Sequence, residues 1–332
     1  DDYSGIDPLL AYEAPKDGIY ISRIFCFPTT PDSRLGFFGK DNCIYRLTLT
    51  TGPYVDRTWP LAVQRDQPAE VELLGWNIPA ELRRVPVKST AKDERVFLQP
   101  PGFANGIGLR TEPHRVAEKL GKPPVSASGR LEKPGNRATF SFDGVKGKTL
   151  SIALEARDLD LPLDAVLTIR NAAGKTLQRA QAAKLNADPS LDFTPPEDGA
   201  YALEVRDLYD EGGPRYSFLV RVRPAQPSFT ATLATDRFEG KAKQPLEIPI
   251  AVEYRHGMKG PLEVRVQGLP DSAKAEFVAG KDLKKSKVRI QGIDAPLNGP
   301  IRLFASAKGQ PEQVVLVDEW KEPFAWLMVK EK

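Results

Sequence analysis

The sequence predicts an all-β protein built from tandem β-sandwiches, and three observations lead to this fold class. The chain has 332 residues, which is too long for one sandwich and suggests two to four domains. Its 30 prolines and 26 glycines fall between short apolar runs, as in a protein of many short strands joined by turns. Two stretches far apart in the sequence also share one residue pattern, which indicates a repeated structural unit.

The composition excludes two classes of partner. No apolar window of about 18 residues occurs, so the sequence predicts no membrane span. The formal net charge is only +3, from 47 basic and 44 acidic residues spread along the chain, so we expect no nucleic acid partner. The densest basic run is interpreted as a solvated strand edge where lysines block further pairing, and it contains Lys281, Lys284, Lys285 and Lys287 around Asp282.

The repeat pairs Asp7–Tyr20 with Asp188–Tyr201, and it continues from Tyr45–Leu49 to Tyr216–Val220. In both copies a leucine and an aromatic residue lie two positions apart, so they face the same side of a strand and enter the core. A proline then ends the pairing of this strand with its neighbour, and an Asp-Gly pair makes a tight turn. A tyrosine begins the return strand, where its ring packs and its hydroxyl finds a hydrogen bond. The shared pattern predicts one corner of a sandwich.

Only the second copy has a front half before this corner. We expect its strands at Ser126–Leu131, Ala138–Phe142, Thr149–Ala156 and Ala165–Arg170. Six residues precede Asp7, so the first copy is expected to begin partway through a domain, with exposed strand edges. Two explanations stay open: a preceding segment was cleaved and remains bound, or a protein partner supplies the strands.

The start of the chain and its cysteines bear on location. The chain starts at Asp1 rather than Met, which suggests a processed or cut form that has lost its targeting signal. Cys26 and Cys43 lie in the runs Ile19–Phe27 and Asn42–Thr50, which are expected to be two strands of one hairpin. A disulfide between them would add about 3 kcal/mol and imply an oxidising compartment. Two buried free thiols are the alternative.

Four motifs of the second copy resemble the bacterial pre-peptidase C-terminal domain, in the version abundant in planctomycete exported proteins. They are Ser128–Gly135, Lys146–Leu150, Leu163–Leu167 with Ala173–Lys175, and Pro196–Tyr201 with Val205–Asp207. The resemblance covers about 113–224, and the rear half of another copy at 1–52. It implies a jelly-roll-like sandwich, a secreted or cell-surface location and an accessory role beside catalytic domains. Some collagenase members of the family bind calcium and protein substrate.

The chain departs from this family at two positions that bear on calcium. The family often opens with Glu-Pro-Asn and an acidic residue, where this chain has Glu112-Pro113-His114-Arg115. It often carries Asp-x-Asp before a phenylalanine strand, where this chain has Asn136-Arg137-Ala138. Calcium prefers six to eight oxygen ligands with several carboxylates, so these losses argue against the family's metal site.

Two other regions are predicted to be immunoglobulin-like. Turn and strand signals over Pro60–Pro79 indicate a small domain, and Gly268-Leu269-Pro270 resembles a turn of bacterial surface modules. Further strands are expected at Leu246–Tyr254, Leu262–Val266, Lys287–Ile290 and Ile301–Ala307. The predicted domains are 1–52, 53–111, 112–224 and 225–332, joined by short proline-marked connections as a semi-rigid rod.

The sequence contains no recognisable catalytic constellation. His114 and His256, its two histidines, fall in different predicted domains, and no His-Glu-x-x-His motif is present. There is no Gly-x-Ser-x-Gly elbow and no phosphate-binding glycine loop, and two cysteines cannot make a four-ligand zinc site. We therefore expect a protein that is not an enzyme and has no cofactor, with calcium binding left open.

A calcium site is predicted from two acidic loops. The first loop carries Asp158, Asp160 and Asp164, and the second carries Asp207, Asp210 and Glu211. If the sandwich brings the loops together, their carboxylates supply the oxygen ligands that calcium prefers. The alternative is that they are solvated loops in which Asp207 pairs with Arg206 or Arg157.

Exposed aromatic residues offer another route to binding, by stacking on sugar rings or anchoring a protein. The candidates are Trp59, Trp76, Tyr209, Trp320 and Trp326. Trp59 and Trp76 are expected in the core of the small domain, and one of Trp320 and Trp326 is expected at the surface.

The leading hypothesis is a non-catalytic binding and scaffold protein at the cell surface, in the periplasm or outside the cell, with protein as its ligand. The alternatives are an accessory region of a secreted hydrolase with an upstream catalytic domain, and carbohydrate binding.

Overall fold

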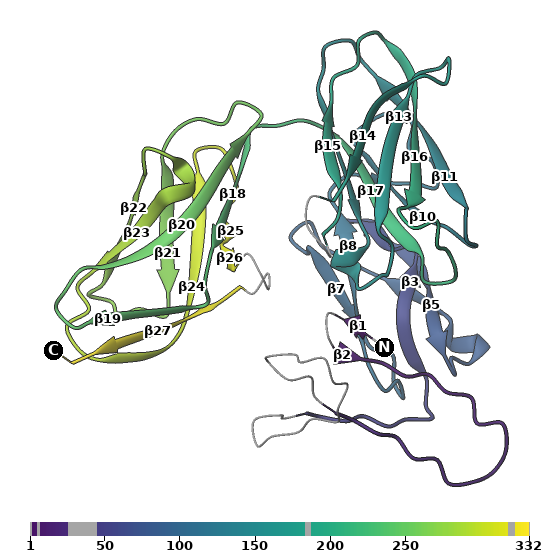
Figure 1. Ribbon diagram of the computed structural model, residues 1–332, viewed down its shortest axis with the longest axis horizontal. Coiled ribbons are helices and arrows are strands. Elements are labelled where there is room, and N and C mark those ends of the chain that lie inside the picture. Colours follow the sequence, from purple (N-terminus) through teal and green to yellow (C-terminus); the bar gives the residue numbers. More distant parts are fainter. Residues whose placement is uncertain (1, 5–6, 26–44, 183–186, 318–322, 332) are drawn as a thin grey trace, which may run out of the picture. The chain divides into compact units, whose positions relative to one another are not determined.

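The computed structural model describes residues 2–4, 7–25, 45–182, 187–317 and 323–331, and almost all of the regular structure is β. Contacts divide the chain into two units, residues 1–224 and 225–332. The predicted all-β class with tandem sandwiches is therefore confirmed (Figure 1). No helix among the described residues is long and apolar enough to cross a membrane. The finer division of the first unit into three domains stays a prediction.

A small sandwich occupies residues 54–112 of the first unit. One three-stranded sheet has the order β3-β5-β6, and the other has the order β4-β8-β7. Alternation along β5 turns Val71 and Leu73 into a core that also contains Val55 and Leu109. The strands are β3 (Tyr54–Trp59), β4 (Ala62–Gln64), β5 (Ala69–Trp76), β6 (Arg84–Val87), β7 (Arg95–Leu98) and β8 (Ile107–Glu112).

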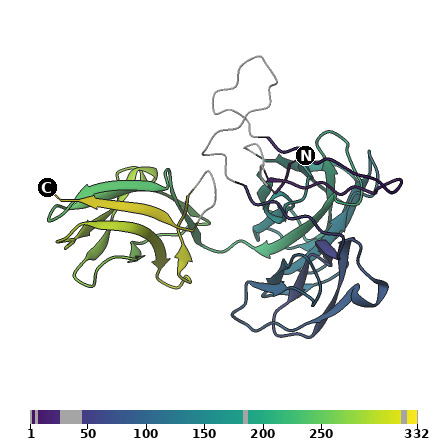
Figure 2. The ribbon, with the colours of Figure 1, turned by 90° about the horizontal axis from the view of Figure 1, so that it is seen from below.

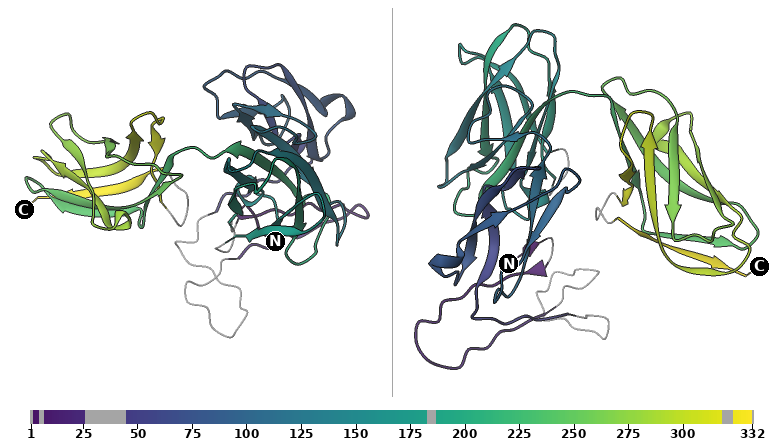
Figure 3. Two further views of the ribbon diagram at one scale, coloured as in Figure 1. Left: turned by 90° about the horizontal axis from the view of Figure 1, so that it is seen from above. Right: turned by 180° about the vertical axis from the view of Figure 1, so that it is seen from behind.

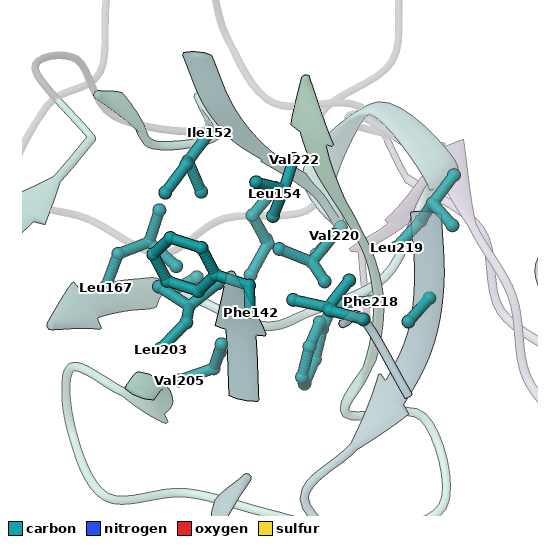
Figure 4. Close-up of a cluster of buried hydrophobic side chains, with 14 of the residues drawn as sticks. Phe142, Ile152, Leu154, Leu167, Leu203, Val205, Phe218, Leu219, Val220 and Val222 are labelled. Carbon is teal, nitrogen blue, oxygen red and sulfur yellow. The ribbon is translucent and has the colours of Figure 1, made fainter. Parts of the chain in front are cut away.

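A large sandwich follows, with a five-stranded sheet β15-β12-β17-β10-β9 facing a four-stranded sheet β11-β16-β13-β14. The strands are β9 (Arg115–Val116), β10 (Val125–Arg130), β11 (Arg137–Gly144), β12 (Leu150–Glu155), β13 (Ala165–Arg170), β14 (Thr176–Gln181), β15 (Ser190–Phe193), β16 (Gly199–Asp207) and β17 (Ser217–Pro224). The four strands predicted for the front half are present as β10 to β13. Fully buried side chains such as Phe142, Ile152, Leu167 and Phe218 fill the space between the sheets (Figure 4).

The second unit is a sandwich of two sheets, which Figure 2 shows as two layers. Its strands are β18 (Ser228–Leu233), β19 (Arg237–Lys241), β20 (Leu246–Arg255), β21 (Leu262–Gln267), β22 (Lys274–Val278), β23 (Ser286–Gln291), β24 (Leu297–Ala307), β25 (Gln313–Val314), β26 (Leu316–Val317) and β27 (Ala325–Lys330). The interpretation of the lysine run as a strand edge is wrong. It forms the short 3-10 helix Leu283–Lys285 and leads into β23, which pairs with β22 on one side and β20 on the other.

The first copy of the repeat forms little regular structure. Its described part contains only β1 (Asp2–Ser4) and β2 (Asp7–Pro8), and residues 9–25 and 45–50 are not strands (Figure 3). The strands expected at Ile19–Phe27 and Asn42–Thr50 are therefore wrong over their described residues. Cys26 and Cys43 lie outside the described residues, so their disulfide stays a prediction.

Candidate functional site

Asp207, the central residue of the predicted calcium site, is buried at the end of β16 and bonded to the backbone. Its Oδ2 accepts a hydrogen bond from the amide of Asp164 at 3.0 Å. Its Oδ1 accepts from the amides of Tyr209 at 2.8 Å and Glu211 at 3.0 Å. Arg206 does not pair with this carboxylate; its Nη1 donates to the Asp207 carbonyl at 2.6 Å. The Asp207 side chain thus organises the loop after β16.

The other predicted calcium ligands lie in the same region but do not form one cluster. Asp164 accepts from Arg157 Nη2 at 2.8 Å, and Asp210 lies 3.6 Å from Arg206. Asp158 and Asp160 belong to the turn η2 (Arg157–Leu159) and its left-handed cap. Within the described part of the chain, no three histidine, cysteine or acidic side chains gather in a way that could hold a metal ion. Calcium binding stays a prediction.

Glu112, which the sequence analysis named only as the start of the motif Glu112-Pro113-His114-Arg115, is a functional candidate in the structure. It ends β8 of the small sandwich, yet its buried carboxylate contacts two arginines of β17 in the large sandwich. Oε1 accepts from Arg221 Nε at 2.6 Å, and Oε2 accepts from Arg223 and from Ser126 Oγ, the latter at 2.9 Å. Burial would raise the pKa of Glu112, but the two guanidinium groups outweigh it and hold the pKa below its ordinary value.

A second carboxylate extends this charged cluster. Glu155 of β12 pairs with Arg110 of β8 at 3.1 Å and with Arg221. Two carboxylates and three guanidinium groups thus meet between the small and large sandwiches. Buried ion pairs of this kind fix one arrangement, because separating them leaves charges without partners. We call this set, Glu112, Glu155, Arg110, Arg221 and Arg223, the junction cluster.

Other contacts reinforce the same junction. Asp56 of β3 lies 3.2 Å from Arg215 of the large sandwich, and the Leu61 amide donates to Ser128 Oγ at 2.9 Å. Leu61 and Ala62 also belong to the buried core of the large sandwich. The small and large sandwiches are therefore held together by polar and apolar contacts alike.

A groove of about 530 Å³ opens beside this junction. Trp59 on its wall is only half-buried, and Arg130 lies 4.9 Å from the centre of its ring. Trp76 is half-buried as well and packs against Tyr54 with ring centres 5.9 Å apart. Neither tryptophan lies in the buried core, so that expectation is wrong. The groove is lined by Trp59, Pro60, Val116, Ala117, Glu118 and Ser128.

Two of the other predicted aromatics are exposed. Tyr209 protrudes from the loop that Asp207 organises, and Trp326 lies on β27 of the second unit. The Trp326 Nε1 donates to Asn298 Oδ1 at 2.7 Å, which fixes the ring on the sheet surface. Trp320 lies outside the described residues.

The two copies of the repeat share the same local corner. In the large sandwich, the Tyr201 hydroxyl donates to the Glu197 carbonyl at 2.7 Å, and in the first copy the Tyr20 hydroxyl donates to the Lys16 carbonyl at 2.6 Å. An aromatic partner lies beside each tyrosine, with ring centres 5.0 Å apart in the large sandwich and 5.4 Å apart in the first copy. The repeated pattern thus encodes the same hydrogen-bonded corner twice. In each copy the tyrosine and the residue whose carbonyl accepts its hydrogen bond are four positions apart.

The burial of the two copies is opposite. Large apolar side chains of the first copy are exposed, whereas their counterparts in the large sandwich are buried. The exposed fractions are 77% for Leu10 against 8% for Leu191, 62% for Tyr12 against 3% for Phe193, and 46% for Tyr20 against 3% for Tyr201. We call the exposed set of the first copy, Leu10, Tyr12, Tyr20, Ile24, Tyr45, Leu47 and Leu49, the rear-half surface.

The two histidines belong to different units of the chain. His114 is in the first unit, near Arg223, and its pKa is lowered by burial and by that positive charge. His256 is in the second unit, where its Nδ1 lies 2.9 Å from the Gln226 carbonyl. No catalytic domain is evident among the described residues.

Comparison with known proteins supports the family resemblance of the large sandwich. Residues 136–207 match the family model of the bacterial pre-peptidase C-terminal domain. A solved structure of that domain from a Bacillus anthracis collagenase is 14% identical, covers 34% of this chain and 98% of its own, and has a TM-score of 0.26. Residues 136–207 are thus similar to the pre-peptidase C-terminal domain. No curated protein matches the chain.

Two other solved structures are similar over most of the chain. One is SGBP-B of the Bacteroides ovatus mixed-linkage glucan utilization locus, in complex with a mixed-linkage heptasaccharide. It is 11% identical, covers 87% of this chain and 70% of its own, and has a TM-score of 0.22. The other is an I-band fragment of titin, which is 8% identical, covers 86% of this chain and all of its own (100%), and has a TM-score of 0.23.

Proposed function

From the pre-peptidase C-terminal domain at residues 136–207, we propose that this chain is a binding and scaffold region that works outside the cytoplasm and engages protein. The domain itself is a non-catalytic accessory fold. Its family resemblance supports a location in the periplasm, at the cell surface or outside the cell.

The rear-half surface is the observation that carries protein binding. Its side chains are large and apolar, and they gather on two segments that share the sequence pattern of a buried core. Soluble proteins rarely leave contiguous apolar patches uncovered, and such patches commonly mark sites of protein interaction. A flat sugar or a metal ion would leave most of these aliphatic side chains in water. A polypeptide would bury them.

The junction cluster supports the scaffold role. Because buried charges link β8 to β12 and β17, the small and large sandwiches move as one body. A rigid pair of sandwiches holds whatever is attached to its two ends at a fixed spacing.

Cross-linking in intact source cells tests the binding role. Lys16 lies on the exposed turn next to the rear-half surface, and Lys308 is an exposed lysine of the second unit that serves as the control. We expect a lysine-reactive reagent to join Lys16 to one defined polypeptide segment far more often than Lys308. Equal, scattered cross-links from both lysines would contradict the proposal. Location is tested by protease treatment of intact cells and of spheroplasts, and a chain found only in the cytosol would contradict it.

Two alternatives have their own support. The family match favours an accessory region of a secreted hydrolase, and a native product much larger than this chain with an upstream catalytic motif would establish that role. The exposed Trp326 and the groove beside Trp59 favour carbohydrate binding, since indole rings stack on sugars. A glycan array tests this, with Trp326→Ala and Trp59→Ala as matched variants, and a blank array removes it.

A further inference from the structure

The topology of the large sandwich shows why its rear half cannot fold alone. β15 pairs with β12, and β17 lies between β10 and β12. In the other sheet, β16 lies between β11 and β13 (Figure 1). None of these three rear-half strands pairs with another. Each one obtains its backbone hydrogen bonds from strands of the front half, residues 125–170. A rear half without those strands has no ladder to join.

The first copy behaves as this topology requires. Its segments 9–25 and 45–50 carry the sequence pattern of β15, β16 and β17, yet they form no strands. The corner around Tyr20 is nevertheless present, because its hydrogen bond spans four residues and needs no partner strand. Local structure is therefore encoded and formed, while the long-range pairing is missing. Backbone groups and apolar side chains are left exposed together.

The large sandwich also shows the chemistry that would cover this surface. There Phe142 of β11 stacks on Tyr201, with ring centres 5.9 Å apart and planes at 30°, and contacts Phe193 edge-on at 6.1 Å. Ile152 of β12 and Leu167 of β13 belong to the same buried core. These front-half side chains are the packing partners that Phe193 and Tyr201 have and that the equivalent residues Tyr12 and Tyr20 lack among the described residues.

We infer that the rear-half surface is completed by one polypeptide segment with the strand pattern of β10 to β13. Its strands insert between and beside residues 9–25 and 45–50, pairing with their backbones and burying Leu10, Tyr12 and Tyr20. An exposed strand edge is a ready template for such addition. The inference rests on the proposed function, because it names the partner of the surface that engages protein.

The test grafts a front half onto the existing chain. Residues 117–187 are duplicated before Asp1 through a flexible glycine-serine linker, and hydrogen exchange is measured by mass spectrometry on peptides from 9–25 and 45–50. In the unmodified chain these amides should exchange at nearly the rate of an unfolded peptide. With the graft we expect exchange to slow by roughly 100-fold or more, as it does when amides enter a ladder. The control graft carries Phe142→Asp, Ile152→Asp and Leu167→Asp in the duplicated copy, and it should give no protection.

Three results would overturn the inference. One is unchanged exchange in the grafted chain while the β16 amides of the large sandwich remain protected. Another is equal protection by the intact and the control graft. The third is protection in the unmodified chain that grows with concentration as the mass doubles, because a second copy would then cover the surface. Cross-links from Lys16 to a partner that has no such strands would sink this inference but leave protein binding intact.

Discussion

Replacing Glu112 with glutamine should loosen the junction between the small and large sandwiches. The variant keeps the size of the side chain but removes the charge that faces Arg221 at 2.6 Å and Arg223. Removing one member of a buried ion pair costs roughly 3–5 kcal/mol. Arg221 retains Glu155 as a partner, so we expect the low end, about 3 kcal/mol. For a unit of this size, that corresponds to a fall in Tm of roughly 6–12 °C.

Hydrogen exchange at increasing urea concentration would measure the loss, followed on amides of β8, β10 and β17. The matched control is Glu70→Gln, because Glu70 pairs with Arg84 at 3.4 Å on the exposed face of the small sandwich. An exposed pair contributes about 0–1 kcal/mol, so the control should barely change the free energy of unfolding. If Glu112→Gln lost no more stability than Glu70→Gln, the junction cluster would not be what holds the two sandwiches together.

The same substitution has a signature in pH. The pKa of Glu112 is lowered in the folded protein, so its contribution is fully present above its unfolded value and is lost as pH falls through the lower, folded value. The gap in stability between the wild type and Glu112→Gln should therefore be constant near neutral pH. It should narrow as pH falls below about 4.3, the ordinary value for glutamate. A gap that widened in acid would refute the electrostatic account.

Three other predictions concern the large sandwich. Tyr201→Phe removes a buried hydrogen bond and should cost about 1 kcal/mol in urea unfolding, whereas Tyr20→Phe should cost nothing measurable; equal costs would contradict the difference in burial. Gly129→Ala should cost about 1–3 kcal/mol, because its Cβ would overlap the ring of Phe218; an unchanged Tm would show that the core can adjust. Chelation by EDTA should leave the Tm unchanged, because backbone amides already occupy the Asp207 carboxylate, and a marked fall would instead establish a bound calcium ion.

Much of the fold could be predicted from local pattern. Alternation and turn residues placed β10 to β13, and the repeat marked the corner around Tyr201. The expectation failed at the other copy, where Tyr20 has the right neighbours in sequence but no strands beside it. It failed again at the lysine run before β23, because neither charge nor alternation reveals which strand will lie on the other side.

The candidate sites were less predictable than the fold. The acidic loops were found by composition, but whether Asp207 meets a metal ion or a backbone amide depends on how the loop after β16 closes. The sequence did not indicate that Glu112 belongs to the junction cluster, because its partners Arg221 and Arg223 lie 109 and 111 residues away in the chain. The sequence indicated that Trp326 could be exposed, but it did not reveal that Trp59 and Trp76 would be only half-buried.

The amino-acid sequence alone determined the fold class of the protein, its repeated corner and the similarity of residues 136–207 to the pre-peptidase C-terminal domain. These properties are local in the sequence. Alternation, turn residues and a tyrosine hydroxyl four residues from its acceptor all lie within one short segment. Tertiary packing alone decided which copy of the repeat buries its apolar side chains. It also decided that Glu112 joins two sandwiches and that the Asp207 carboxylate accepts hydrogen bonds from backbone amides. Those outcomes depend on pairing between distant segments, and two stretches with the same sequence pattern therefore reach opposite burial.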